Sequence, residues 1–282
     1  MALVVPQSLV EPDWLEAHLG DPKVRIIALN WTDSSNFDTG HVPGAIYWEW
    51  KKMLWDPRIR DFPSPATFAE RCGAAGISND TTVVFYGDPA VQFGTYAWWV
   101  FKYCGHQDAR VLNGARKRWE REGHPMTTER SATKPVSYVP ITASNNAHMR
   151  ATRDDINAAI GAENRVILDH RSPEEYRGEL HSPPGTPNHG SERLGHIPGA
   201  RHLHFEDMLS GDTSFKPVEE LRAMLEERGA TPDKNIISYC RLSHRATLAY
   251  FVMTQLLGYS NLRVYDGSWT EWGSLVGAPI EL

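Results

Sequence analysis

The sequence predicts an α/β protein built from two tandem domains, each a parallel sheet flanked by helices. The chain has 282 residues, which suits two domains of about 100–200 residues each. Short apolar runs alternate with segments of helical period, a pattern typical of parallel sheets. The chain also repeats itself. Gly-His-Val-Pro-Gly-Ala at 40–45 returns as Gly-His-Ile-Pro-Gly-Ala at 195–200, and Trp119 matches Trp272 at an offset of 153 residues. A period of domain size indicates a duplication.

Each copy yields the same order of elements. The first is expected to hold a helix at 12–19, a strand at 24–29, the Gly-His-x-Pro-Gly-Ala turn, a helix at 64–74, a strand at 82–86, a further helix and a strand at 109–112. The second is expected to hold their counterparts at 153–160, 165–169, 218–228, 235–239 and 261–265. Ligands of such sheets bind beyond the carboxyl ends of the strands.

Composition gives the domain limits. Residues 1–124 form the first expected domain, and 148–282 form the second. The stretch between them, 125–147, is rich in Thr, Ser, Pro and Asn, and is predicted to be a linker. The second copy carries an insertion at about 179–193, predicted to be an exposed loop. Its His181 and His189 lack the partners of a metal site, so no metal is expected.

Bulk properties exclude several functions. The net charge is −6 and the pI about 6.1, so nothing favours nucleic-acid binding. No apolar run reaches the roughly 18 residues of a membrane span, and the first residues lack the basic and apolar regions of a signal peptide. Three cysteines make no disulfide framework. A reducing, cytoplasmic location is therefore expected.

Cys240 is the candidate nucleophile. It follows the apolar strand that ends at Tyr239, and helical spacing begins at Ala246. Such a junction aims successive backbone N–H groups at one point, and the helix start adds partial positive charge. Arg241 and Arg245 add two full charges. A thiol in this setting should ionise more readily than a free one, and the thiolate is the nucleophilic form.

The first copy lacks this arrangement. Gly87 stands at the position of Cys240, and the Asp88 that follows would repel an anion. Chemistry is therefore expected in the second half, with the first half as scaffold and one wall of the cleft. Cys72 and Cys104 each precede a glycine in a helix-like run and are predicted to be structural. The turn histidines, His41 and His196, occur in both copies and are expected to hold the turn by hydrogen bonding.

These residues resemble the tandem-domain rhodaneses, the thiosulfate and 3-mercaptopyruvate sulfurtransferases. The resemblance spans nearly the whole chain. It rests on both Gly-His-x-Pro-Gly-Ala motifs, the segment 168–179, the Tyr-Cys-Arg sequence at 239–241 and the segment 265–272. It implies two rhodanese-like domains, an inactive first domain, a cysteine persulfide as intermediate, and no organic cofactor.

The resemblance also implies roles for single residues. Cys240 matches the sulfur-carrying cysteine, and Arg171 matches the arginine that grips the anionic part of the donor. Trp31 lies where the family often has a tryptophan lining the cleft. Arg241 is typical of the thiosulfate type of loop, whose mercaptopyruvate counterpart has glycine there. For Arg171, a plain ion pair with a nearby glutamate, 174 or 175, is the structural alternative.

Two positions of the loop depart from the family pattern. Ser243 replaces the usual glycine, and a serine would be strained if that position needs a positive φ. Leu242 replaces a residue that is often basic in the thiosulfate type. His244 and Arg245 are expected to supply that charge, although Arg245 could instead cap the helix or join an interdomain ion pair. A cradled thiolate needs no base, so His244 is expected to bind and not to catalyse.

The resulting hypothesis is a sulfurtransferase. It takes sulfane sulfur from thiosulfate as a persulfide on Cys240 and passes it to cyanide, a small thiol or a protein thiol such as that of a thioredoxin. 3-Mercaptopyruvate is the alternative donor. A non-enzymatic rhodanese-like binding module is a more distant alternative, against which Cys240 argues. A cysteine-dependent phosphatase would need Cys-x5-Arg, whereas Arg245 gives Cys-x4-Arg.

Overall fold

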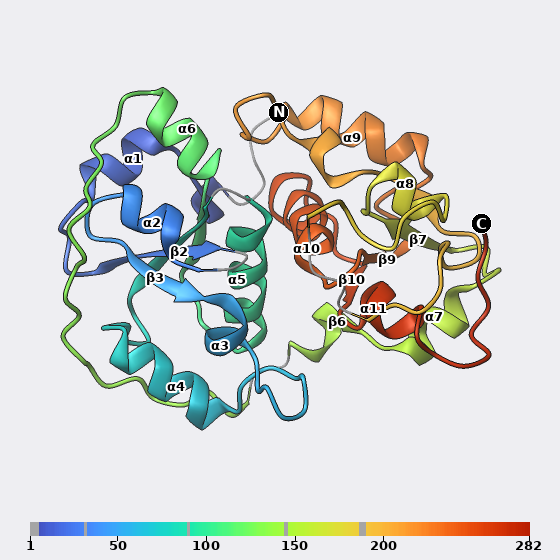
Figure 1. Ribbon diagram of the computed structural model, residues 1–282, viewed down its shortest axis with the longest axis horizontal. Coiled ribbons are helices and arrows are strands. Elements are labelled where there is room, and N and C mark those ends of the chain that lie inside the picture. The colour runs from blue at the N-terminus through green and yellow to red at the C-terminus, as the bar shows by residue number, and fades with distance from the viewer. Residues whose placement is uncertain (1–5, 31–32, 89–90, 144–145, 186–189) are drawn as a thin grey trace. The chain divides into compact units, whose positions relative to one another are not determined.

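A computed structural model describes residues 6–30, 33–88, 91–143, 146–185 and 190–282. It divides into two compact units (Figure 1). Within the described residues, the first unit comprises 6–147 together with Ser210–Phe215, and the second comprises His148–Leu209 and Lys216–Leu282. The stretch expected to be a linker, 125–147, therefore lies with the first unit. So does a short segment from the second half of the sequence.

Each unit contains one five-stranded parallel sheet. The first has the order β1-β5-β4-β2-β3, and the second has β6-β10-β9-β7-β8. The two orders become identical when each strand is matched to its counterpart in the other half. The predicted α/β class and the pair of parallel-sheet domains are confirmed.

In the first unit the elements are η1 (Pro6–Ser8), β1 (Leu9–Val10), α1 (Pro12–Ala17), β2 (Val24–Asn30), α2 (Ser35–Thr39), β3 (Ile46–Glu49), α3 (Trp50–Leu54), α4 (Pro65–Ala74), β4 (Thr82–Gly87), α5 (Gln92–Tyr103), β5 (Ala109–Leu112) and α6 (Ala115–Arg121).

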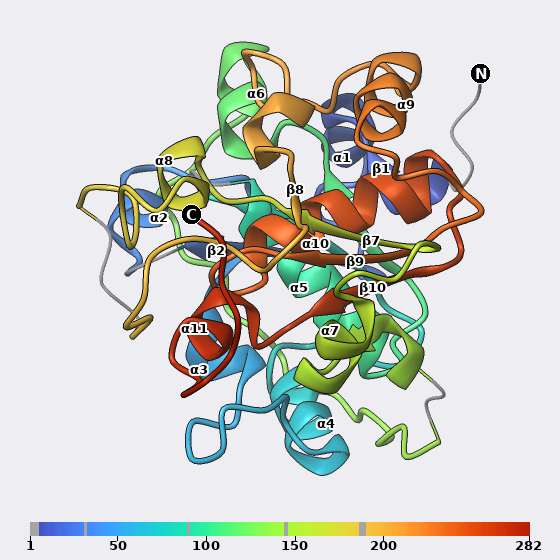
Figure 2. The same cartoon turned by 90° about the vertical axis from the view of Figure 1, so that its right-hand side faces the viewer.

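The second unit repeats this plan, with β8 (2 residues) shorter than its counterpart β3 (4 residues). A 3-10 turn, η2 (Ala147–Met149), leads into it. Its elements are β6 (Arg150–Ala151), α7 (Arg153–Ala159), β7 (Arg165–Asp169), α8 (Pro173–Tyr176), β8 (Arg201–His202), η3 (Phe205–Met208), α9 (Val218–Glu227), β9 (Asn235–Tyr239), α10 (His244–Phe251), the π-helical turn η4 (Val252–Leu256), β10 (Leu262–Tyr265) and α11 (Ser268–Trp272). Figure 2 shows α10 above and α7 below the strands β9 and β10.

The central strands are buried on both faces, which is why they read as continuous apolar runs. In the second unit the core gathers β7, β9 and β10 with side chains from α7 and α11. In the first unit α5 packs against β4 and β5, and its residues from Phe93 to Phe101 are all buried. In the second unit α10 packs against β9 and β10 in the corresponding way. This packing fixes the carboxyl end of β9 and the start of α10.

Both Gly-His-x-Pro-Gly-Ala turns are held by their histidines, as expected. His41 donates through Nδ1 to the Phe37 carbonyl (2.8 Å), and its backbone pairs with Thr127. His196 donates through Nδ1 to the Tyr176 carbonyl (2.8 Å), and its backbone pairs with Glu281. Each copy thus closes by laying a late segment of its own chain against the turn.

The insertion of the second copy is anchored at its end by Arg193. The guanidinium donates to four backbone carbonyls near the end of the chain, those of Trp272, Gly273, Leu275 and Ala278, at 2.6–3.1 Å. Pro184 and Gly185, earlier in the insertion, are exposed, and His189 lies outside the described residues.

Candidate active site

Cys240 is the first residue after β9, and its loop leads directly into α10. The residue is 1% exposed. Its N–H donates to Ser268 Oγ (3.3 Å), and its carbonyl accepts from the Trp269 N–H (2.9 Å). The next carbonyl, of Arg241, accepts from the N–H and the hydroxyl of Thr270. The start of α11 therefore holds the first two residues of the loop in place.

The middle of the loop has unused donors. Within the described part of the chain, the N–H groups of Leu242 and Ser243 have no protein acceptor. The Ser243 carbonyl accepts from the Thr247 N–H (2.8 Å), which begins α10, and the Ser243 side chain makes no capping hydrogen bond. Free N–H groups at a helix start attract anions. The loop therefore offers a site for the negative charge of a sulfur atom or an oxyanion.

Ser243 adopts the left-handed conformation that glycine usually supplies. Its φ is +73° and its ψ is −21°. Its hydroxyl lies close to two acceptors, the Asp266 carbonyl (2.7 Å) and Asp266 Oδ1 (2.8 Å). Arg150 Nη2 in turn donates to Asp266 Oδ2 (2.9 Å). The position does need a positive φ, and the serine is held there by its own side chain.

Arg245 forms a buried ion pair with Glu175. Its two terminal nitrogens donate to the two carboxylate oxygens at 2.5 and 3.0 Å, and Glu175 is fully buried. Burial alone would raise the pKa of Glu175, but Arg245 lowers it below the ordinary value. Glu175 also completes the capping box of α8 with Ser172. Glu175 lies in the same unit as Arg245, so this pair is not the interdomain ion pair that was the alternative for Arg245.

Arg171 is fully buried and pairs with Asp169. Nε and Nη2 donate to the Asp169 carboxylate at 2.6–3.1 Å, and Nη2 also donates to the Gly195 carbonyl (2.7 Å). Tyr239 donates its hydroxyl to Asp169 Oδ2 (2.6 Å). The alternative of an ion pair with Glu174 or Glu175 is thus wrong. Arg171 Nη1 has no hydrogen-bond partner among the described residues, so one donor remains for a ligand.

The remaining loop side chains are also buried. Arg241, Leu242 and His244 are each exposed by no more than about 5%. Burial lowers the pKa of Arg241, while the charges of Glu175 and Cys240 act to raise it. Arg245 likewise interacts electrostatically with Cys240. Both guanidinium groups therefore lie within electrostatic reach of the sulfur. Trp31 lies outside the described residues.

Three acidic residues organise this site: Asp169, Glu175 and Asp266. The sequence did not indicate Asp169 or Asp266, and it offered Glu175 only as a partner of Arg171. Asp169 pairs with Arg171, two positions away, and Glu175 pairs with Arg245, 70 positions away. Asp266 contacts Ser243 and Arg150, which are 23 and 116 positions away. For Asp266 the repeat was the available signal. Asp266 corresponds to Asn113 in the first copy, whose side-chain amide donates a hydrogen bond to Glu11. A recurring polar residue directly after the last strand marks a structural position.

In the first copy the equivalent strand end is closed by its own ion pair. Asp88 is buried and accepts from Arg116 Nη1 at 3.1 Å, and Arg116 Nε pairs with Glu120 (2.7 Å). These residues line a hollow of about 280 Å³ with Asn36 and Lys117. Burial raises the pKa of Asp88, and Arg116 only partly offsets that effect.

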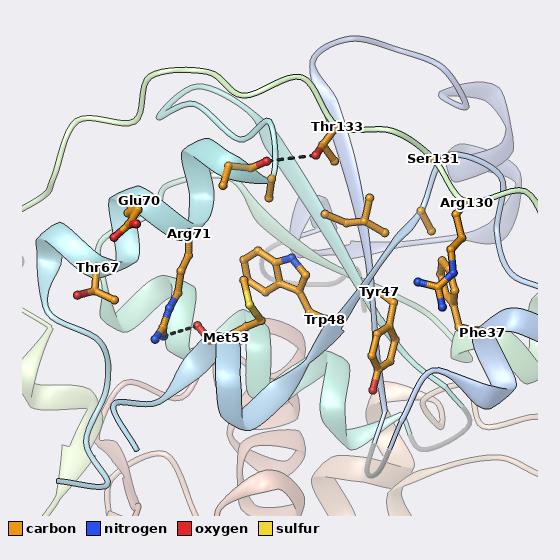
Figure 3. A pocket seen from close by; sticks show the side chains of 14 residues that line it. Phe37, Tyr47, Trp48, Met53, Thr67, Glu70, Arg71, Arg130, Ser131 and Thr133 are labelled. Atoms are coloured by element: carbon orange, nitrogen blue, oxygen red, sulfur yellow. Dashed lines mark hydrogen bonds between the residues drawn. The ribbon is translucent and has the colours of Figure 1, made fainter. Parts of the chain in front are cut away.

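A larger hollow, of about 690 Å³, lies in the first unit beside β3 and α4 (Figure 3). Its lining contains no cysteine and no histidine. Two of its polar side chains are already bonded: Arg71 donates to the Met53 carbonyl (2.9 Å) and Thr133 donates to the Ala74 carbonyl (3.2 Å). No residue of the loop at 240–245 lines it.

The other cysteines have a different setting. Cys72 is fully buried, and burial raises the pKa of its thiol. Burial raises the pKa of Cys104 to about 12. Among the residues with described positions, no group of three or more His, Cys, Asp or Glu side chains could hold a metal ion. None of the described helices is both long and apolar enough to cross a bilayer.

Comparison with known proteins gives consistent results. A model of the rhodanese-like domain matches twice, at residues 11–122 and 152–275. The chain is 46% identical to "Sulfur carrier protein TtuD" of Thermus thermophilus, over 99% of this chain and 98% of that protein. It is 42% identical to a "Putative thiosulfate sulfurtransferase" of Mycolicibacterium smegmatis, over 97% of each. The solved structure "The wildtype structure of EanB" shares the fold, with a TM-score of 0.84 and 23% identity over 98% of this chain and 69% of that chain.

Proposed function

The chain belongs to the rhodanese-like family, and from this premise we propose that it carries sulfane sulfur as a persulfide on Cys240. Family membership and the names of its relatives make it a sulfurtransferase. One observation supports the choice of Cys240 most: it stands at a strand–helix junction with unused N–H groups beside it and two guanidinium groups interacting with its charge. The first copy has no such group at Gly87.

In the first step the Cys240 thiolate attacks the outer sulfur of thiosulfate. A bond forms between the two sulfur atoms, the bond inside thiosulfate breaks, and sulfite leaves with the electron pair. The charge is then on the outer sulfur of a persulfide, where the N–H groups of Leu242 and Ser243 stabilise it as an oxyanion hole stabilises oxygen. Arg171 Nη1, buried and without a protein acceptor among the described residues, is suited to an oxygen of the donor.

In the second step a nucleophilic acceptor attacks the outer sulfur. With cyanide the product is thiocyanate. With a thiolate it is a new persulfide, and in both cases Cys240 leaves as the thiolate that began the cycle. Splitting one transfer into two displacements predicts ping-pong kinetics. Electrons and protons balance between donor and acceptor, so the cycle needs no metal and no organic cofactor.

The loop chemistry favours thiosulfate as donor over 3-mercaptopyruvate. Thiosulfate carries two negative charges, and Arg241 and Arg245 are both within electrostatic reach of Cys240. The relatives named for thiosulfate transfer agree with this choice. The relative named as a sulfur carrier supports a second candidate function, delivery of the persulfide sulfur to a protein thiol such as that of a thioredoxin. Free cysteines suit the reducing, cytoplasmic location that we propose.

Intact-mass measurement after thiosulfate treatment tests the proposal. We expect a gain of about 32 Da, one sulfur atom, that cyanide removes as thiocyanate. Cys240→Ser should take up no sulfur, whereas the matched control Cys104→Ser should take up the full amount. Full sulfur transfer by Cys240→Ser would overturn the persulfide.

The donor is tested by comparing kcat/KM for thiocyanate formation from thiosulfate and from 3-mercaptopyruvate. We expect thiosulfate to be preferred by about tenfold or more, since two arginines near the thiol favour the more highly charged donor. A preference for 3-mercaptopyruvate would reassign the donor and leave the Cys240 persulfide in place. Hydrolysis of an aryl phosphate faster than sulfur transfer would instead indicate phosphatase chemistry.

A further inference from the structure

Resting on the sulfurtransferase proposed above, we propose that Asp266 is a positioning residue that keeps the loop at 240–245 open to anions by holding the Ser243 hydroxyl. The observation behind this is a serine at the start of a helix that does not cap it. Ser243 has φ +73° and no capping hydrogen bond, and its hydroxyl lies 2.7–2.8 Å from Asp266 acceptors.

A serine in this position normally behaves differently. At a helix N-cap its backbone is extended, and its hydroxyl accepts from an N–H of the first turn. Ser172 does this at the start of α8, where its φ is −64° and its hydroxyl accepts from the Glu175 N–H (3.3 Å). Ser243 therefore occupies a backbone region that non-glycine residues avoid, and its capping capacity is unused.

Asp266 is built to compensate for that strain. It is almost fully buried, and Arg150 fixes its second carboxylate oxygen (2.9 Å). Its first carboxylate oxygen and its carbonyl both face the Ser243 hydroxyl. While the Ser243 hydroxyl donates to Asp266, the Ser243 side chain does not cap α10.

The two uses of the Ser243 side chain need different backbone conformations, since a capping serine has a negative φ and Ser243 has a φ of +73°. Without the Asp266 carboxylate, the Ser243 hydroxyl keeps only the backbone carbonyl of residue 266 as an acceptor. Ser243 is then held less firmly against a return to a negative φ, where it is a good cap for α10. Its oxygen would then accept from an N–H of the first turn of α10, and the change in φ would re-aim the loop N–H groups assigned above to the anion. Asp266 thus acts through Ser243, and the effect falls on anion binding more than on the reacting thiol.

A double-mutant cycle read as kcat and KM for thiosulfate tests this. We expect Asp266→Ala to raise KM by about tenfold, the equivalent of one charge-assisted hydrogen bond, with a smaller change in kcat. In a Ser243→Gly background the same substitution should add less than about twofold, because glycine tolerates a positive φ and has no hydroxyl to swing back. Ser243→Ala should raise KM more than Ser243→Gly does, although alanine is closer to serine in size. Asp266→Leu, which is similar in size and also removes the side-chain acceptor, serves in the same cycle if Asp266→Ala does not fold.

Controls separate this effect from general damage. Asp155, in the same unit, also pairs with an arginine, Arg263 (2.7 Å), and lies outside the loop. Asp155→Asn should lower stability without raising KM. An equal loss from Asp266→Ala in both backgrounds, or a better Ser243→Ala than Ser243→Gly, would overturn the positioning role. Sulfur loading of Cys240 measured by mass in each variant shows whether a failure concerns this role or the persulfide itself.

Discussion

The two halves of the chain share a backbone and differ in charge at one strand end. Both sheets have the same strand order, and even an unusual conformation recurs: Ala115 and Ser268, at equivalent positions, have φ of +48° and +51°. The carboxyl end of β4 carries Gly87 and Asp88, and that of β9 carries Cys240 and Arg241. The fold therefore accepts opposite charges at this place, and activity depends on a few positions within it.

The electrostatic surroundings of the two strand ends are also opposite. In the first copy Asp88 is neutralised by Arg116, whose counterpart in the second copy is the uncharged Trp269. In the second copy Arg241 and Arg245 both interact with Cys240, and Glu175 balances one of them. One strand end is thus satisfied from within, and the other retains positive charge for an incoming anion.

The strongest challenge to this comparison is to move the thiol from one copy to the other. Cys240→Gly should reduce sulfur transfer by at least about 10³-fold, since the nucleophile is gone. Adding Gly87→Cys to that variant should restore nothing, because Arg116 is already paired with Asp88 and leaves no positive charge there for a thiolate or for thiosulfate. Thiocyanate production and intact mass measure both effects. A persulfide on residue 87 would show that the surroundings matter less than the thiol.

A smaller effect is expected from giving the second copy the charge of the first. Arg241→Asp should lower kcat/KM for thiosulfate by roughly 10²-fold, because an attractive charge beside the sulfur becomes repulsive. Arg241→Gln, which only removes the attraction, should cost about tenfold. Equal losses in the two variants would mean that the side chain acts by packing and not by charge.

The buried ion pairs should respond to pH in opposite directions. Glu175 has a lowered pKa, so its stabilising effect is present above the ordinary glutamate pKa and is lost as the pH falls through the lower folded value. Glu175→Gln should cost about 3 kcal/mol at pH 7, because Arg245 is left unpaired in the interior. Denaturant unfolding of the full chain measures this cost.

Asp88 has a raised pKa, so its contribution is present at acid pH and is lost as the pH rises through that value. Asp88→Asn resembles the protonated form and leaves Arg116 bonded to Glu120. It should therefore change the free energy of unfolding at pH 7 by no more than about 1 kcal/mol. A loss as large as that of Glu175→Gln would refute the contrast between the pairs.

The smallest effect is expected at the cysteines of the first copy. Burial raises the pKa of Cys104 to about 12, so its thiol stays protonated at neutral pH. Cys104→Ala should leave the rate of thiocyanate formation within about twofold of the original, since it contributes no thiolate. Uptake of a second sulfur atom that disappears in this variant would give the first half a chemical role.

Local pattern was sufficient to predict most of the fold. The strands expected at 109–112, 165–169 and 235–239 are observed with those limits, because apolar runs bounded by polar residues define buried strands. The helix expected at 64–74 begins one residue later, at Pro65, with Ser64 as its cap. The junction that holds Cys240 was located for the same reason.

Side-chain pairing in the site could not be predicted in this way. Arg245 and Glu175 are 70 residues apart, and the local periodicity of the sequence does not indicate which acidic side chain pairs with which basic one. Arg171 has three acidic residues within four positions, and the structure pairs it with Asp169 and not with the glutamates that follow. The hydrogen bond from Ser243 to Asp266 can be predicted only when the φ of Ser243 and the position of β10 are known. Such contacts depend on tertiary distances.

The anchoring of Arg193 has a practical consequence for engineering. One guanidinium fastens the end of the insertion to four carbonyls, whereas Pro184 and Gly185, earlier in the insertion, are exposed. Gly185 is exposed, has a φ of +78°, and has nothing within 4 Å of the place a side chain would take. A purification tag or a fluorescent reporter spliced in at this point should leave melting behaviour unaltered, provided that Arg193 is kept.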